Sequence, residues 1–199
     1  MSGAFPISTA KFGTLGIKSI QNTIISKTVS GKKLARQIDN QRWAFSVQII
    51  TGKRSDVYGE LMAFIIKQRS GKENFTIIPP EVEDARGTAS GTPTGTGSAG
   101  DTSITLGGTG TGTLKAGDFI KFASHDKVYM VVADQSDIST GTLTIEPPLT
   151  TAVSSSDIQY DNVPFTVHLT NDVQEFGVSG VDKDGNLYYE YQFDVEESL

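Results

Sequence analysis

At 199 residues, the chain is long enough for one medium-sized domain, or for one domain with a smaller one inserted into it. Its composition is globular, with 37% hydrophobic and 20% charged residues, and no apolar run approaches the roughly 20 residues that a membrane helix needs, so we expect a soluble protein without membrane insertion. The sequence contains no cysteine, which excludes disulfides, thiolate nucleophiles and cysteine-ligated metals.

The net charge of −6 conceals two electrically opposite parts of the chain. Residues 1–80 contain 12 Lys and Arg against 4 Asp and Glu, a balance of +8, whereas residues 81–199 contain 5 against 19, a balance of −14. The basic part therefore binds either nucleic acid or an acidic surface on this chain or a neighbouring copy. We favour the acidic surface, because the basic residues are dispersed and no aromatic-interleaved basic groove for single strands is present.

The N-terminal 50 residues predict strands. The opening MSGAFPISTAKFG has no secretory leader pattern, so we expect synthesis in a cytoplasm, and residues 1–30 predict short strands and loops. QRWAFSVQII (41–50) places Trp43, Phe45, Val47 and Ile49 on one face, which predicts a half-buried strand. We expect Trp43 to anchor the core, with an interface anchor as the alternative.

One amphipathic helix follows this strand. SDVYGELMAFIIKQRSGKE carries apolar residues at i, i+4, i+7 and i+8, so its apolar stripe is expected to pack on a sheet. Ser55 or Asp56 is the expected N-cap, and Gly71 is expected to end the helix in the left-handed conformation. NFTIIPP (74–80) predicts a further strand that its two prolines terminate.

The middle of the chain predicts an insertion over residues 85–158. Residues 87–113 contain nine Gly and nine Thr with almost nothing apolar, which predicts a linker or exposed loop with one short strand at TSITL. LKAGDFIKF, KVYMVVAD and GTLTIEPPL then predict short strands of a small meander or barrel. Residues 1–84 plus 159–199 would form the outer domain.

Long strands return at the C-terminal end. The segments 164–169, 173–180 and 187–197 are predicted strands, and DKDGN predicts the turn before the last of them. In 187–197 the odd-numbered positions through Val195 are apolar or aromatic and face one way. The outer domain is therefore expected to consist of antiparallel strands around one helix.

No motif predicts catalysis, a cofactor or a metal. GTGSAG (95–100) has the spacing of a dinucleotide fingerprint, but neither a strand before it nor a helix after it is predicted, so we interpret it as a Gly/Thr hinge. His125 and His168 are too separated to indicate a metal site, and each is expected to be hydrogen-bonded or solvated. Without Cys or a G-x-S-x-G elbow, nucleophilic catalysis has no support, so we expect a protein that is not an enzyme.

Two regions nevertheless resemble a known class of proteins. The N-terminal block with W-x-F-x-V, the helix with A-F and the strand ending in Pro resembles structural proteins of tailed-bacteriophage tails and baseplates. The later pattern with L-x-A-G-D-F resembles a β module found inside such proteins. The resemblance implies a tail-tube-like or distal-tail-like fold, mainly β, as a β-sandwich or barrel with one flanking helix and an inserted all-β module.

The resemblance also implies a function. It implies a virion component, made in the host cytoplasm, that forms a homo-oligomeric ring around the tail channel, contacts other tail or baseplate proteins and meets DNA only in transit. Pairing of exposed strand edges and docking of basic on acidic faces would support such a ring. The alternative is a host-surface glycan-binding module carried by the insertion. The candidate assembly interface consists of Lys32, Lys33, Arg36, Arg42 and Trp43.

Overall fold

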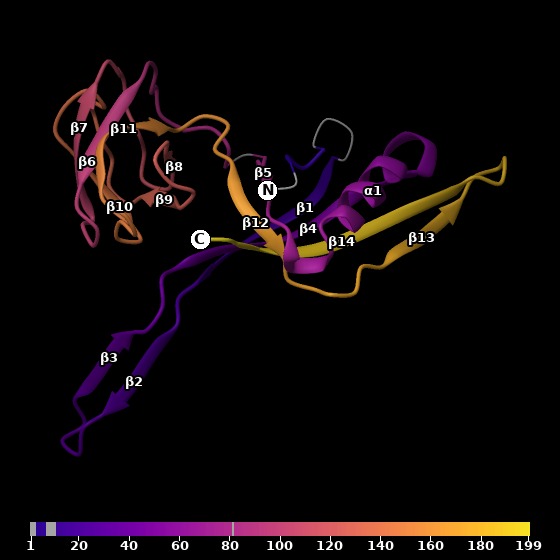
Figure 1. The fold of residues 1–199 in the computed structure, drawn as a ribbon, viewed down its shortest axis with the longest axis horizontal. Helices are drawn as coiled ribbons and strands as arrows, with labels where there is room; N and C mark the ends of the chain where they lie inside the picture. The colour runs from indigo at the N-terminus through magenta and orange to yellow at the C-terminus, as the bar shows by residue number, and fades with distance from the viewer. Residues whose placement is uncertain (1–2, 7–10, 81) are drawn as a thin grey trace.

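The computed structural model describes residues 3–6, 11–80 and 82–199, which form a six-stranded sheet with one helix, a closed six-stranded barrel and a separate two-stranded hairpin (Figure 1). The strands are β1 (Phe12–Ile20), β2 (Thr23–Lys27), β3 (Lys33–Gln37), β4 (Arg42–Lys53), β5 (Phe75–Ile77), β6 (Pro93–Gly97), β7 (Ser103–Gly108), β8 (Phe119–Phe122), β9 (Val128–Val131), β10 (Thr142–Glu146), β11 (Val153–Gln159), β12 (Phe165–Leu169), β13 (Phe176–Val181) and β14 (Leu187–Glu197). The helix is α1 (Gly59–Lys67). The predicted mainly-β fold with one helix and a small all-β module is confirmed.

The large sheet has the order β1-β4-β14-β12-β5, and β13 pairs with the outer part of β14. All its ladders between these strands are antiparallel. The alternation predicted for residues 41–50 is confirmed, since Trp43, Phe45, Val47 and Ile49 are all buried. They share one core with α1 and with the inward side chains of β14. A period-two pattern of large apolar residues thus fixes which face of the sheet is covered.

The helix lies where it was predicted, but both of its predicted ends are wrong. A π-helical turn (Arg54–Tyr58) leads directly from β4 into α1, so neither Ser55 nor Asp56 caps the backbone, and the Ser55 hydroxyl donates to the Asp56 carboxylate instead. At the other end Arg69 and Ser70, with φ of 53° and 60°, take the left-handed conformation. Gly71 is required for close approach, because an added Cβ would lie 2.5 Å from the Leu169 carbonyl oxygen.

The Gly/Thr-rich segment is ordered, which corrects the prediction of a linker. It forms β6 and β7, two neighbouring strands of the closed barrel β10-β7-β6-β11-β8-β9. Hydroxyls pair across its two halves, as Ser90 with Thr111 and Thr92 with Thr109, each at 2.8 Å. Gly95 faces the packed interior, where an added Cβ would lie 2.6 Å from the ring of Phe122. The segment was predicted to be disordered because it has few apolar residues of its own. Cross-strand hydroxyl pairs, and glycines that leave room for large side chains from neighbouring strands, order it instead.

The barrel has a hydrophobic core of its own, distinct from the core of the large sheet. The predicted strands of the barrel correspond to β7, β8, β9 and β10, whereas β6 and β11 were not predicted. The chain enters and leaves the barrel at adjacent points, where the Val163 N–H donates to the Glu83 carbonyl at 3.0 Å and the Asn162 N–H to the Asp84 carboxylate at 3.0 Å. Closure removes exposed strand edges from this part of the molecule.

Two hairpins project beyond the packed body in Figure 1. The first, which we call the basic hairpin, comprises residues 20–38 with β2 and β3, and it leaves the sheet where β1 ends and β4 begins. The second, which we call the acidic arm, comprises residues 172–190 with β13 and the outer part of β14, next to the far end of β4. The predicted turn at its tip is confirmed, with Gly185 at φ 81°. Among the described residues, no helix has the length and apolarity to span a membrane.

Candidate assembly surface and barrel junction

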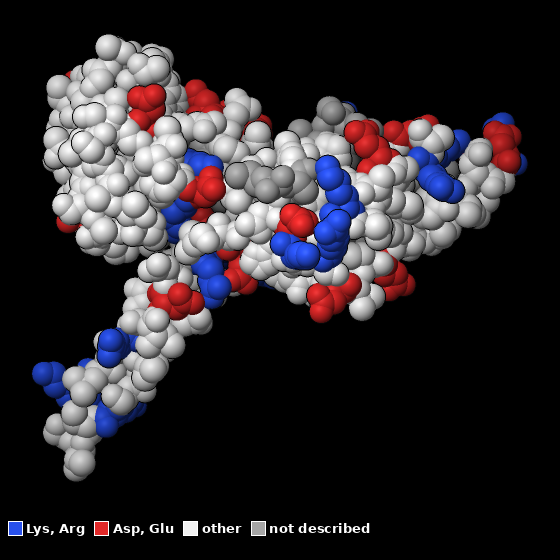
Figure 2. All heavy atoms as spheres, in the orientation of Figure 1, with Lys and Arg blue, Asp and Glu red and all other residues white. Residues whose placement is uncertain are grey.

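The basic hairpin carries three of the five residues of the candidate assembly interface, Lys32, Lys33 and Arg36. Every residue of β2 and β3 is exposed, and residues 20–38 contain four Lys and Arg but no Asp or Glu. Among the described residues, none of these four cations forms an ion pair; they are Lys27, Lys32, Lys33 and Arg36. Figure 2 shows basic side chains gathered on this projection.

One face of the basic hairpin is also apolar. In the strand register Ile24 pairs with Arg36, so their side chains lie on the same face. Leu34 and Ile38 share this face with Arg36, because side chains two residues apart on a strand point the same way. Ile24, Leu34 and Ile38 are 58%, 50% and 56% exposed. An isolated two-stranded hairpin is marginally stable in water, so burial of this apolar face against another surface would stabilise the hairpin.

The other two residues of the candidate interface lie at the root of the hairpin and make contacts within the chain. The Arg42 guanidinium forms ion pairs with Asp39 and Glu196, both at 2.9 Å. Trp43 is only 6% exposed, and its indole N–H donates to the Val128 carbonyl of the barrel at 2.9 Å. Its ring packs edge-on against Phe119 at a centroid distance of 5.1 Å. Trp43 therefore joins the sheet to the barrel, in the core position that the alternation favoured.

A buried ion pair lies beside Trp43 at this junction. The Lys127 ammonium of the barrel donates to the Glu197 carboxylate of β14 and, at 2.8 Å, to the side-chain oxygen of Gln41. The two oxygens of Glu197 also accept the backbone N–H groups of Trp43 at 3.1 Å and Val128 at 2.9 Å. Every one of these polar groups comes from the sheet or from β9 and its entry, so the network fixes how the barrel sits on the sheet.

Burial dominates the electrostatics of this pair. It raises the pKa of the Glu197 carboxyl and lowers the pKa of the Lys127 ammonium, because both charged forms lose hydration, while their mutual attraction opposes both shifts. Sequence reasoning missed the pair, although a signal was present. Position 197 continues the apolar face of β14 after Val195, so a carboxylate there predicts a buried partner.

GTGSAG is strand and tight turn, which corrects its interpretation as a hinge. The first residues belong to β6, and no helix follows. The backbone N–H groups that a phosphate would need are occupied within the protein: Ser98 donates to Asp101 and Gly100 to the Leu149 carbonyl, both at 2.7 Å. The segment therefore lacks both parts of a dinucleotide site, the helix start and the free donors.

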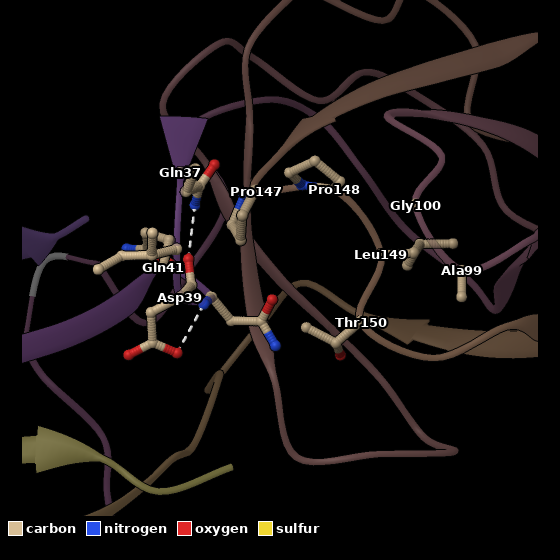
Figure 3. A pocket seen from close by; sticks show the side chains of 11 residues that line it. Gln37, Asp39, Gln41, Ala99, Gly100, Pro147, Pro148, Leu149 and Thr150 are labelled. Atoms are coloured by element: carbon tan, nitrogen blue, oxygen red, sulfur yellow. Dashed lines mark hydrogen bonds between the residues drawn. The ribbon is translucent and has the colours of Figure 1, made fainter. Parts of the chain in front are cut away.

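A hollow of about 550 Å³ lies between the root of the basic hairpin and the barrel loops (Figure 3). Its lining residues are Gln37, Ile38, Asp39, Asn40, Gln41, Ala99, Gly100, Pro147, Pro148, Leu149 and Thr150. The Gln37 side-chain amide donates to the Asp39 backbone carbonyl at 2.9 Å, and the Asn40 backbone N–H donates to the Asp39 carboxylate at 2.8 Å. The lining contains neither a histidine nor an aromatic side chain, and its one carboxylate is paired with Arg42.

The two histidines lie in different parts of the molecule. His125 bonds to the Tyr129 hydroxyl at 2.8 Å, as expected for a satisfied side chain, and burial lowers its pKa. His168 lies on β12 and is partly exposed, and its buried Nδ1 has no hydrogen-bond partner among the described residues. Within the described part of the chain, His, Asp and Glu side chains form no cluster that could hold a metal.

The comparisons with known proteins bear on the barrel. Residues 81–163, which contain all six barrel strands, match the family described as distal tail protein pb9, B domain. No curated protein matches the chain. The resemblance to tail structural proteins, drawn from the sequence, is confirmed for the distal-tail type. Residues 81–163 therefore resemble the B domain of a distal tail protein, and the match supports a structural role for the chain in a bacteriophage tail.

Proposed function

We propose that copies of this chain assemble head-to-tail into a ring around the tail channel. The observation that carries the proposal is the basic hairpin, which leaves the packed body with exposed aliphatic residues and four unpaired cations among the described residues. A projection of this kind gains stability only when another surface covers it. Contacts between unlike surfaces of identical chains close into rings when the rotation between copies allows.

The edges of the large sheet support the same proposal. Among the described residues, β1 pairs only with β4 and β13 only with β14, so each has one unpaired side. Exposed edges attract other strands unless they are covered, and neighbouring copies in a ring cover them. The barrel, by contrast, is closed and adds no edge.

The proposal has three further parts. Residues 1–84 plus 159–199 form the ring-building domain, and residues 85–158 form the inserted module. The ring contacts other tail or baseplate proteins, and DNA meets it only in transit. The chain acts as a non-enzymatic component, made in the host cytoplasm.

Glycan binding by the inserted module stays a prediction that the barrel's surface does not favour. Small-ligand sites use aromatic side chains together with a few polar groups. The aromatic residues of the barrel strands are buried, namely Phe119, Phe122 and Tyr129. The ring is therefore the function that the described residues support best.

Analytical ultracentrifugation and electron microscopy of the purified chain test the ring. Wild type is expected to form closed oligomers whose population increases with concentration. A variant in which residues 23–37 are replaced by a short Gly/Ser turn is expected to keep the cooperative thermal unfolding of wild type, because these residues contribute nothing to either hydrophobic core, but to sediment as a monomer. A wild-type chain that stays monomeric at every concentration, alone and with tail partners, would refute the proposal.

A further inference from the structure

We propose that the basic hairpin of one copy docks on the acidic arm of the next copy; this rests on the proposed ring and specifies its contact. The two projections have opposite charges of equal size. Residues 20–38 carry four cations and no carboxylate, a balance of +4. Residues 172–190 carry five carboxylates and one lysine, a balance of −4. Complementary charge of this kind selects partners and orients them on approach.

Both projections carry exposed charges; on the hairpin, Arg36 shares a face with Ile24 and Leu34, and Lys33 lies on the other face. Glu175 and Glu190 line a hollow of about 390 Å³ at the base of the acidic arm, and both are exposed. In the part of the chain that the structure describes, neither carboxylate has an ion-pair partner, and the same holds for Lys33 and Arg36. Each side therefore offers charges that nothing within its own copy neutralises.

Both projections also carry exposed aliphatic side chains. Ile24 and Leu34 are exposed on the basic hairpin, and Val178 and Val181 on the acidic arm. Val178 and Val181 lie on β13, the strand with an unpaired side. Contact between the two projections would therefore remove apolar surface and a strand edge from water together with the pairing of charges.

The two projections cannot meet within one copy. β4 connects them: its first residue, Arg42, pairs with Ile20 at the root of the basic hairpin, and its last, Lys53, pairs with Tyr188 on the acidic arm. A 12-residue strand spans roughly 40 Å. Figure 1 shows the hairpin and the arm projecting at different ends of the sheet. Because unlike surfaces at opposite ends meet only between copies, the contact is head-to-tail, as ring closure requires.

Paired charge reversal tests the contact. Lys33→Glu/Arg36→Glu on the hairpin, or Glu175→Lys/Glu190→Lys on the arm, is expected to weaken self-association by about tenfold to a hundredfold, measured by sedimentation equilibrium at low salt. A 1:1 mixture of the two variants is expected to associate, because each reversed hairpin meets a reversed arm and each unchanged hairpin meets an unchanged arm. A single chain that carries all four reversals is expected to form rings again.

Matched controls separate this contact from net charge. Lys11→Glu/Lys72→Glu and Glu146→Lys/Asp157→Lys change the charge by the same amounts at exposed positions outside both projections, and they are expected to assemble like wild type. Because the chain lacks cysteine, Leu34→Cys and Val178→Cys chains can be mixed with a flexible bismaleimide, and a covalent dimer is expected only from the mixture.

The outcomes distinguish this contact from the ring itself. If wild type forms rings but the four-reversal chain does not, the docking of hairpin on arm is wrong while the ring stands. If wild type stays monomeric, both fail. Rings that survive the hairpin reversal but lose retention on a DNA column would also overturn the contact, since the hairpin would then bind nucleic acid.

Discussion

The buried ion pair at the barrel junction gives the sharpest stability prediction. Lys127→Met keeps the apolar stem of the side chain but removes the ammonium from a carboxylate that is completely buried. Removal of one partner of a buried pair costs about 3–5 kcal/mol in the free energy of unfolding, because the remaining charge lacks compensation. For a chain of this length each kcal/mol corresponds to roughly 2–4 °C, so we expect a decrease in Tm of roughly 6–20 °C.

The control is a pair of the same chemistry at the surface. Lys115 and Asp134 form an ion pair at 2.9 Å with side chains that are 44% and 59% exposed. Lys115→Met is expected to change the free energy of unfolding by less than about 1 kcal/mol. The double variant Lys127→Met/Glu197→Gln is expected to recover part of the loss, since the amide oxygen of glutamine still accepts a backbone N–H.

Urea and thermal unfolding, followed by the fluorescence of Trp43, measure these differences. Trp43 is the only tryptophan and lies in contact with the barrel, so its emission reports the junction directly. If Lys127→Met unfolds within about 1 kcal/mol of wild type, like Lys115→Met, the ion pair does not hold the barrel in place and the reasoning is refuted.

Two further predictions concern a glycine and a carboxylate. Gly95→Ala is expected to destabilise the barrel by about 1–3 kcal/mol through overpacking on Phe122, whereas Gly16→Ala, whose added Cβ has its nearest neighbour at 3.8 Å, is expected to fold normally; equal urea midpoints would contradict this. The ion pair with Lys53 holds the pKa of Asp182 below its ordinary value of 3.8, so its contribution is complete above about pH 4 and is lost as the pH falls toward the lower pKa of the folded state. Asp182→Asn should abolish this acid dependence of the β13–β14 turn, measured by NMR; an unchanged acid profile would show that the pair is not formed.

Much of the large sheet could be predicted because its pattern is local. Trp43 to Ile49 alternate with a period of two, and the helix that follows changes the period, so both element types were identified correctly. The helix ends were not predictable in the same way. They depend on how β4 runs directly into the helix and on the approach of Leu169 to Gly71, which are contacts between distant parts of the chain.

The barrel and the candidate site show a different limit. The Gly/Thr segment looked disordered because its own apolar content is small, yet its glycines admit side chains that other strands supply, such as Phe122 and Ile158 at Gly95. The sequence identified the cations of the basic hairpin but not its isolation, because exposure depends on what fails to cover it. It likewise missed Lys127 and Glu197, which lie 70 residues apart in the sequence.

The adjacent entry and exit of the barrel have a consequence for how such a chain changes during evolution. Since Glu83 and Val163 are hydrogen-bonded neighbours, the segment between them can be shortened, replaced or lost without displacing the strands on either side. The junction limits this freedom, because loss of the barrel would leave the Glu197 carboxylate without Lys127 and would expose Trp43. A relative without the barrel is therefore expected to carry small or polar residues at the positions of Trp43 and Glu197. Substitutions at these two positions would then accompany every gain or loss of the module.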